Sequence, residues 1–165
     1  MTIAIDSSEA ELKPLLLAPG EGQTVGALGV TLTFKIAGAE TGGRWLVAEY
    51  TAPPQLDGPP PHVHKTTTEI FHVLDGALTV QTNGQSMQLG PGGCAYIPPG
   101  TVHTFANPTN AAARFLLIAS PAGLENYFAE AAELIRNEPS WPPKDMGKFF
   151  ALMAKYDTFP PSARP

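Results

Sequence analysis

Apolar and polar residues alternate in the segment 30–36, where valine, leucine, phenylalanine and isoleucine are separated by threonine and lysine. Such an alternation is typical of a β-strand with one buried face. Short segments rich in β-branched and aromatic residues follow at 45–51, 69–76, 77–82, 86–89, 94–97, 103–110 and 113–120. Turn signals separate these segments, and Asn83-Gly84 is the strongest hairpin signal among them. Because no helical pattern lies between them, a parallel βαβ sheet is excluded and an antiparallel sandwich or barrel is predicted.

The pattern changes after Ser120, where apolar residues take the three- and four-residue spacing of an amphipathic helix. The positions are Leu124, Tyr127, Phe128, Ala131, Leu134 and Ile135. A second helix is predicted near 144–156, with an apolar stripe made of Met146, Phe149, Phe150 and Met153. We expect both stripes to pack against the sheet or a partner subunit rather than to bind a ligand. The tail at 158–165 is expected to be loose or draped over the surface.

The length of 165 residues suits one domain with a hydrophobic core. We divide the chain into an N-terminal arm at 1–24, a β-barrel at 25–120 and a C-terminal helical extension at 121–165. The chain contains 16 glycines and 18 prolines without a fixed period, which fits many turns between short strands. The single cysteine, Cys94, cannot form an internal disulfide, and we expect it to be a small buried residue.

The net charge of -5 comes without any block of lysine or arginine. This charge pattern argues against binding to nucleic acid or to an anionic membrane surface. The N-terminus lacks a basic segment followed by a long apolar run, so no signal peptide is predicted. No apolar run reaches the length of a transmembrane helix, and a cytoplasmic location is therefore expected.

Three of the four histidines lie in the stretch 58–76, close to one glutamate. His62 and His64 are two positions apart, so on an extended backbone their side chains point to the same face. Glu69 follows a short loop, and if it faces the same cavity then His72 points to the opposite face. The alternative is a surface strand, since the pattern His-x-His also occurs there without a metal ion.

The fourth histidine, His103, follows the turn Pro98-Pro99-Gly100, and a rigid turn of this kind can direct it back into the barrel. Together with His62, His64 and Glu69 it would make a site of nitrogen and oxygen donors without sulfur. Such a site suits Fe, Mn, Co, Ni, Cu or Zn and does not select among them.

The two histidine segments resemble the two motifs of the cupin superfamily. The first motif is matched by His62, His64, Glu69 and Gly76, whereas its opening glycine is not matched, because Gly58 lies too close to His62. The second motif is matched throughout, by Gly92, Pro98, Gly100, His103 and Asn107. The resemblance implies an all-β fold, an antiparallel double-stranded β-helix (jelly-roll barrel) with C-terminal α-helices. It also implies one divalent transition metal per chain, held by His62, His64, Glu69 and His103. A single motif pair indicates a monocupin.

Segments that flank the motifs resemble the single-domain cupins described as quercetin dioxygenase-like, over roughly residues 20–157. This resemblance implies a metal-dependent dioxygenase that cleaves a flavonol-like or other enolic or phenolic substrate with O2. Glu69 would be the general base, and the substrate pocket would be lined by Phe71, Val73, Tyr96 and Phe105, although for each of these taken singly barrel core is the favoured interpretation. The alternatives are a metal-containing small-molecule binding or sensor protein without turnover and, third, a metal-dependent isomerase. A homodimer is expected, as in many cupins.

Overall fold

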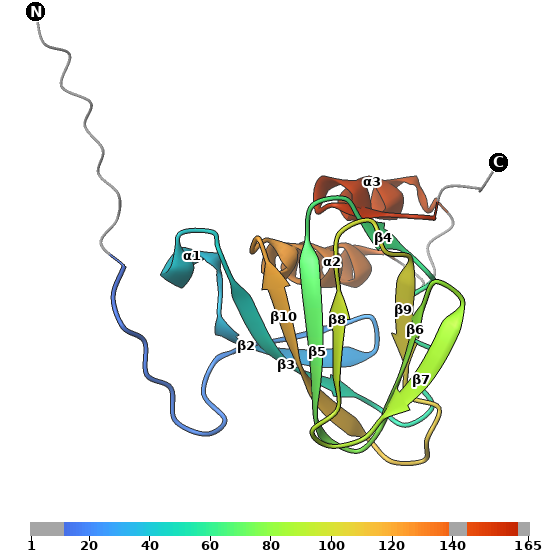
Figure 1. Ribbon diagram of the computed structural model, residues 1–165. Helices are drawn as coiled ribbons and strands as arrows, with labels where there is room; N and C mark the ends of the chain where they lie inside the picture. The colour runs from blue at the N-terminus through green and yellow to red at the C-terminus, as the bar shows by residue number, and fades with distance from the viewer. Residues whose placement is uncertain (1–11, 139–144, 162–165) are drawn as a thin grey trace, which may run out of the picture.

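A computed structural model describes residues 12–138 and 145–161, and antiparallel strands dominate it (Figure 1). The larger sheet has six strands in the order β1 (Gln23–Ala27), β2 (Val30–Ile36), β3 (Leu46–Ala52), β10 (Ala113–Ser120), β5 (Thr68–Asp75) and β8 (Cys94–Ile97). A second sheet has the order β7 (Gln85–Leu89), β6 (Leu78–Thr82) and β9 (His103–Ala106), and a two-stranded sheet joins β11 (Thr158–Phe159) to β4 (Val63–His64). The predicted antiparallel jelly-roll barrel is thereby confirmed.

The core of the barrel lies between the two larger sheets and follows from the alternation of period two. Strand β3 shows this pattern along its whole length, since every second residue from Leu46 to Ala52 is buried. Phe71 of β5 packs edge-on against Phe105 of β9, with ring centroids 5.3 Å apart. Tyr50 stacks on Phe115 at 4.6 Å. These rings fill the barrel interior, and large aromatic side chains contribute much of the apolar area that stabilises such a core.

Asn107 is a fully buried polar residue that connects its own loop, between β9 and β10, to the end of β3. Its side-chain amide donates to the carbonyls of Ala52, Pro53 and Ala111, and its Oδ1 accepts from Thr109. A buried amide is tolerated only when its hydrogen bonds are made, as they are here. The asparagine of the second motif therefore has a structural role in loop closure.

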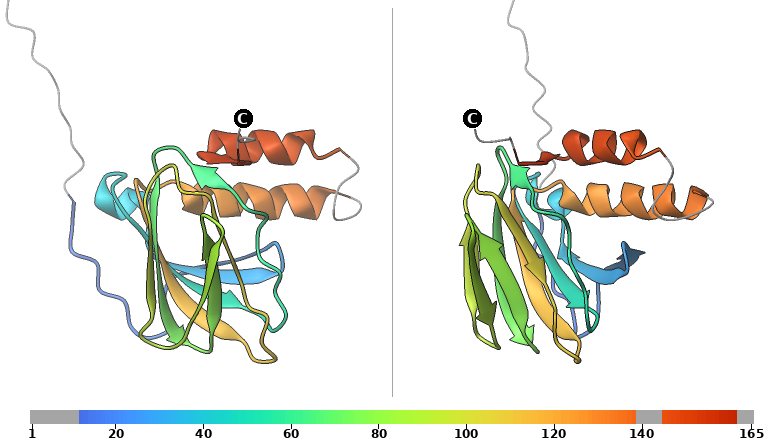
Figure 2. Two further views of the ribbon diagram at one scale, coloured as in Figure 1. Left: turned by 45° about the vertical axis from the view of Figure 1, so that its right-hand side comes forward. Right: turned by 90° about the vertical axis from the view of Figure 1, so that its right-hand side faces the viewer.

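Both predicted helices are present after the barrel, together with a one-turn helix α1 (Gly38–Thr41). Helix α2 (Leu124–Asn137) buries Leu124, Tyr127, Phe128 and Ala131, and α3 (Gly147–Lys155) buries Leu152. The two helices lie side by side at one end of the barrel (Figure 2). Among the described residues, no helix combines the length and apolar character that crossing a membrane requires.

The tail differs from its prediction. Thr158 and Phe159 form strand β11, which pairs with β4 in the register Thr158 to His64. The start of the tail is thus ordered, because β4 offers it backbone partners that no local pattern could reveal. Residues 162–165 lie outside the described part of the chain.

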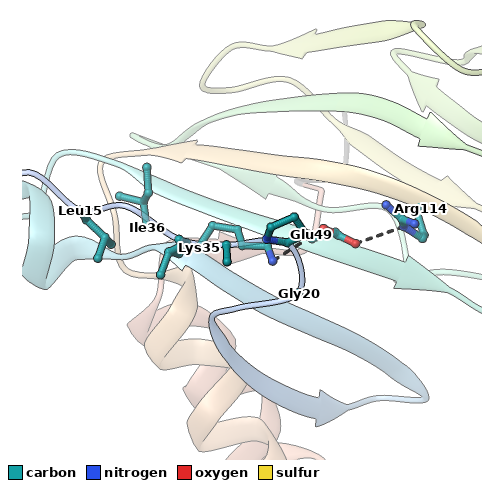
Figure 3. Close-up of a pocket in the computed structure, with 9 residues that line it drawn as sticks. Leu15, Gly20, Lys35, Ile36, Glu49 and Arg114 are labelled. Carbon is teal, nitrogen blue, oxygen red and sulfur yellow. Dashed lines mark ion pairs between the residues drawn. The ribbon is translucent and has the colours of Figure 1, made fainter.

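The N-terminal segment 12–22 has no strand and runs along the outer side of the larger sheet, while residues 1–11 lie outside the described part. It borders a surface hollow of about 720 Å³ together with Lys35, Glu49 and Arg114 (Figure 3). The Glu49 carboxylate lies 3.9 Å from the Lys35 ammonium and 3.1 Å from the Arg114 guanidinium. The one carboxylate is thus shared by two cations. This hollow is larger than the cavity described below, but it lies on the outer face, away from the histidines.

Candidate metal centre

The four residues expected to bind metal come from three strands and one loop at the end of the barrel beside α3. His62 precedes β4, His64 belongs to β4, Glu69 to β5 and His103 to β9. Two backbone hydrogen bonds, of 3.0 and 2.9 Å, join His62 to His103 directly. All four side chains are buried, and each offers one donor atom within 4.8 Å of the others. The structure therefore brings together the residues that the sequence proposed as ligands.

The turn at 98–100 explains how a residue 34 positions after Glu69 reaches the same place. Gly100 has a φ of 79°, a left-handed conformation that glycine adopts without steric cost. Its amide donates to the carbonyl of His64 at 2.7 Å, which ties the turn to β4. Strand β9 then begins at His103, and the imidazole points into the barrel.

Each imidazole in the cluster is oriented by a hydrogen bond at Nδ1. The partners are main-chain carbonyl oxygens, namely Pro60 for His62 at 2.9 Å, Asp157 for His64 at 2.9 Å and Thr101 for His103 at 3.0 Å. A carbonyl oxygen can only accept, so Nδ1 carries the proton and the lone pair of a neutral ring lies on Nε2.

The Nε2 atoms meet the carboxylate of Glu69. Its Oε2 lies 2.8 Å from Nε2 of His103 and 3.3 Å from Nε2 of His64. Nε2 of His64 is buried and has no hydrogen-bond partner among the described residues. Lone pairs that converge on a carboxylate repel one another unless a proton or a cation lies among them. Three imidazoles, each held at Nδ1, and one carboxylate fit a divalent transition metal.

The electrostatics of the cluster keep Glu69 and His62 in the forms that a metal ligand needs, whereas the carboxylate favours a proton on His64. Burial raises the pKa of Glu69, but the neighbouring imidazoles of His103 and His64 outweigh it and hold the pKa well below its usual range. Burial and the neighbouring His103 lower the pKa of His62 to about 4. For His64, burial lowers the pKa, and the Glu69 carboxylate more than offsets this and raises it. At neutral pH, Glu69 is thus ionised and His62 is neutral.

A cavity of about 310 Å³ opens beside the cluster and reaches the two helices. Its wall is mostly apolar and includes Val30, Leu56, Phe105, Leu117, Leu124, Phe128, Met146, Phe149 and Met153, with His62, His64 and Glu69 at one side. The hydroxyl-bearing residues in the wall are Tyr50, Tyr127 and Thr158. Burial raises the pKa of Tyr127 to about 12 and also raises that of Tyr50, so both tyrosines remain protonated hydrogen-bond donors.

The predicted pocket residues divide three ways. Phe105 lines the cavity. Phe71 and Val73 point inward but belong to the core behind the cavity, where they are 0% and 1% exposed. The prediction that Tyr96 lines the pocket is wrong, because its side chain is 64% exposed. Directly paired residues of neighbouring strands share a face of the sheet. Glu69 pairs with the buried Ile97 on the inner face, whereas Tyr96 pairs with Ile70. Tyr96 is therefore on the outer face.

The same alternation places His72 away from the cluster, as expected, because neighbouring residues of a strand face opposite sides. Cys94 is paired with His72 on that outer face, and it is exposed rather than buried as predicted. Sequence reasoning also missed Tyr50, Tyr127 and Asp157. The two tyrosines follow the apolar patterns of β3 and α2 and are indistinguishable there from ordinary core residues, whereas Asp157 gave no signal.

The amino-acid sequence was compared with protein families and with known proteins, and it resembles one domain family and several relatives. The cupin domain model matches residues 48–119. The chain is 33% identical over 92 residues to the quercetin 2,3-dioxygenase of Bacillus subtilis, an alignment that covers 56% of this chain and 27% of that protein. It is 36% identical over 107 residues to the probable oxidoreductase virH of Hypocrea virens, with 59% of this chain and 48% of that protein covered.

The chain thus spans about a quarter and about half of the length of these two curated relatives. Among solved structures, KdgF from a Halomonas species superposes with a TM-score of 0.60 at 16% identity, covering 69% of this chain and 99% of that one. At this identity the likeness concerns the fold alone.

Proposed function

We propose that this chain, which contains a match to the cupin domain and resembles the quercetin dioxygenase-like cupins, is a metal-dependent dioxygenase that cleaves an enolic or phenolic substrate with O2. The observation that carries the proposal is the convergence of three imidazole nitrogens and one carboxylate at the wall of an apolar cavity. The ligands would be His62, His64, Glu69 and His103. When bound, the metal would supply a Lewis acid for a substrate hydroxyl and a centre at which O2 can react.

Glu69 is the residue placed to move a proton. Its carboxylate is ionised and faces both the histidine cluster and the cavity, so it can accept the proton of a substrate hydroxyl that enters there. Tyr50 and Tyr127 line the same space with their hydroxyls protonated, and in the proposed function they would donate to an oxygen of the substrate. The aromatic and methionine side chains of the wall exclude water and offer flat surfaces to an aromatic ring.

The cavity also narrows the class of substrate. Among its described lining residues there is no lysine or arginine, and Glu69 is the only carboxylate. A sugar phosphate or a dicarboxylate would find the metal ion as its only positive partner there, and no charged side chain would compensate the rest of its lost hydration, which is unfavourable. The volume of about 310 Å³ lies at the small end of the range for ligand sites. An uncharged, planar molecule of few rings with one enolic or phenolic hydroxyl fits these properties.

Elemental analysis and oxygen uptake test the proposal together. Protein purified without chelator should carry about one metal per chain, and His62→Ala or His103→Ala should lose it, whereas the control His72→Ala should keep it. Reconstitution with each candidate metal should yield at least one form that consumes O2 with a flavonol or a β-diketone.

Two outcomes would contradict the proposal in different ways. Protein that stays metal-free after reconstitution would remove the metal centre. A metal-loaded protein that binds these compounds without consuming O2 would instead be a binding protein or an isomerase. Light scattering on the same preparation checks the predicted homodimer.

A further inference from the structure

The three histidines of the cluster differ in the origin of their Nδ1 partners. For His62 and His103 the accepting carbonyl lies two residues earlier in the chain, so the bond is part of the local backbone. For His64 the acceptor is the carbonyl of Asp157, which is 93 residues away. The orientation of His64 therefore depends on a segment that must dock from the other end of the chain.

Asp157 is anchored where it docks. Its carboxylate accepts hydrogen bonds of 2.8 to 3.0 Å from the amides of Lys65, Thr66 and Thr67 and from the hydroxyls of Thr66 and Thr67. These donors form the loop between His64 and Glu69. Asp157 has a φ of 57°, a left-handed conformation. In this conformation its carbonyl accepts from His64 and its carboxylate accepts from the loop that follows His64. Such a set of charge-assisted bonds fixes the carbonyl relative to His64.

The neighbouring residues extend this contact. Thr158 pairs with His64 in the β11–β4 sheet, and its hydroxyl lies 3.5 Å from Nδ1 of His64. Just before these residues, helix α3 contributes Phe149 and Met153 to the wall of the cavity. One continuous segment thus covers the cavity with its helix and touches a ligand histidine with its end.

We propose that residues 156–159, the C-terminal strap, are a positioning element of the metal centre, in which Asp157 holds the His64 ring so that Nε2 points at the ion. The inference rests on the metal site proposed above. Loss of the anchor frees the His64 ring to rotate, while His62 and His103 keep their local carbonyls. Metal affinity then falls, because removal of a group that orients a ligand typically costs about 10- to 100-fold.

Nuclear magnetic resonance of histidine-labelled protein tests the strap without any need for turnover. In ¹⁵N-histidine protein, with and without Zn²⁺, the Nδ1–H signals of the three cluster histidines should be protected from solvent exchange. In Asp157→Ala the His64 signal should broaden, while the signals of His62 and His103 persist as internal references. Zn²⁺ affinity, measured by competition with a chelating dye, should fall about 10- to 100-fold.

The control is Asp145→Ala. Asp145 precedes α3, and its Oδ1 accepts from the amide of Gly147 at 2.8 Å. It lies outside the histidine cluster. It should leave the three signals and the Zn²⁺ affinity unchanged. Asp157→Asn keeps the preference for the left-handed conformation and one acceptor oxygen, so the same selective broadening of the His64 signal should occur to a smaller degree. This variant provides the test if the alanine variant is too unstable to study. Equal broadening of all three signals, or unchanged signals with unchanged affinity, would overturn the proposal. A dioxygenase assay that fails in the wild type leaves this result unaffected.

Discussion

Oε2 of Glu69 lies 2.8 Å from Nε2 of His103, and this contact joins strand β5 to strand β9 inside the barrel. Both atoms are of the kind that binds a cation, and both are buried. The same oxygen lies 3.3 Å from Nε2 of His64, so Glu69 stands between two imidazoles. A single carboxylate can therefore serve as a ligand and as an acceptor of a substrate proton, and variants can separate these two roles.

The first prediction concerns Glu69→Gln. The amide retains one carbonyl oxygen for the metal but has no charge with which to accept a proton, so turnover should be lost to a greater extent than metal content. Elemental analysis and oxygen uptake on one preparation measure both. Equal loss of metal and activity would leave Glu69 as a ligand only.

Metal binding should stabilise the fold, because a site formed by three strands and a loop exists only in the native state. At a free metal concentration of 100 times Kd, the free energy of unfolding should rise by about 2.7 kcal/mol. Urea unfolding of the wild type with and without Zn²⁺ measures the gain. His103→Ala should show little of it, whereas His72→Ala, altered on the outer face of β5, should show all of it. A similar gain in His103→Ala would place the stabilising metal elsewhere.

Tyr50→Phe tests whether the hydroxyl of Tyr50 binds the substrate. The ring stays stacked on Phe115, so packing is preserved while one buried hydroxyl is removed. If Tyr50 donates to the substrate, affinity for an enolic ligand should fall by about 0.5–1.5 kcal/mol, or several-fold, with metal content unchanged. Isothermal titration on the metal-loaded protein is the measurement. Unchanged affinity would assign Tyr50 to the core alone.

Much of this site could be predicted from the period of two residues along a strand, the helical spacing of apolar residues after Ser120 and the turn before His103. The remainder depends on which strands pair in the folded protein. The spacing of His62 and His64 sets their common face, and the rigid turn before His103 returns the third imidazole. The prediction that Tyr96 lines the pocket was wrong, because the buried face of a short strand depends on its register with a neighbouring strand. A shift by one residue moves every side chain to the opposite face.

Strand β11 could not be predicted for a related reason. It has two residues, too few for any pattern, and its order comes from pairing with β4 and from the hydrogen bonds of Asp157. Those partners lie about 90 residues earlier, as the separation of 91 between Thr66 and Asp157 shows. Contacts at such separation are specified by the folded barrel and leave no trace in the local sequence.

The final prediction concerns the acid stability that Asp157 supplies. Burial raises the pKa of its carboxyl, but the hydrogen bonds from Thr66, Thr67 and Lys65 outweigh this and lower it from 3.8 to about 2. A carboxyl whose pKa is lower in the folded state stabilises the fold above its unfolded pKa, and this contribution is lost as the pH falls through the folded value. The wild type should therefore be more stable than Asp157→Ala at pH 6, and the difference should shrink between about pH 4 and pH 2. Urea unfolding at a series of pH values, with Asp145→Ala as the matched control, measures it, and a difference that stays constant across that window would show that the charge of Asp157 adds nothing to the strap.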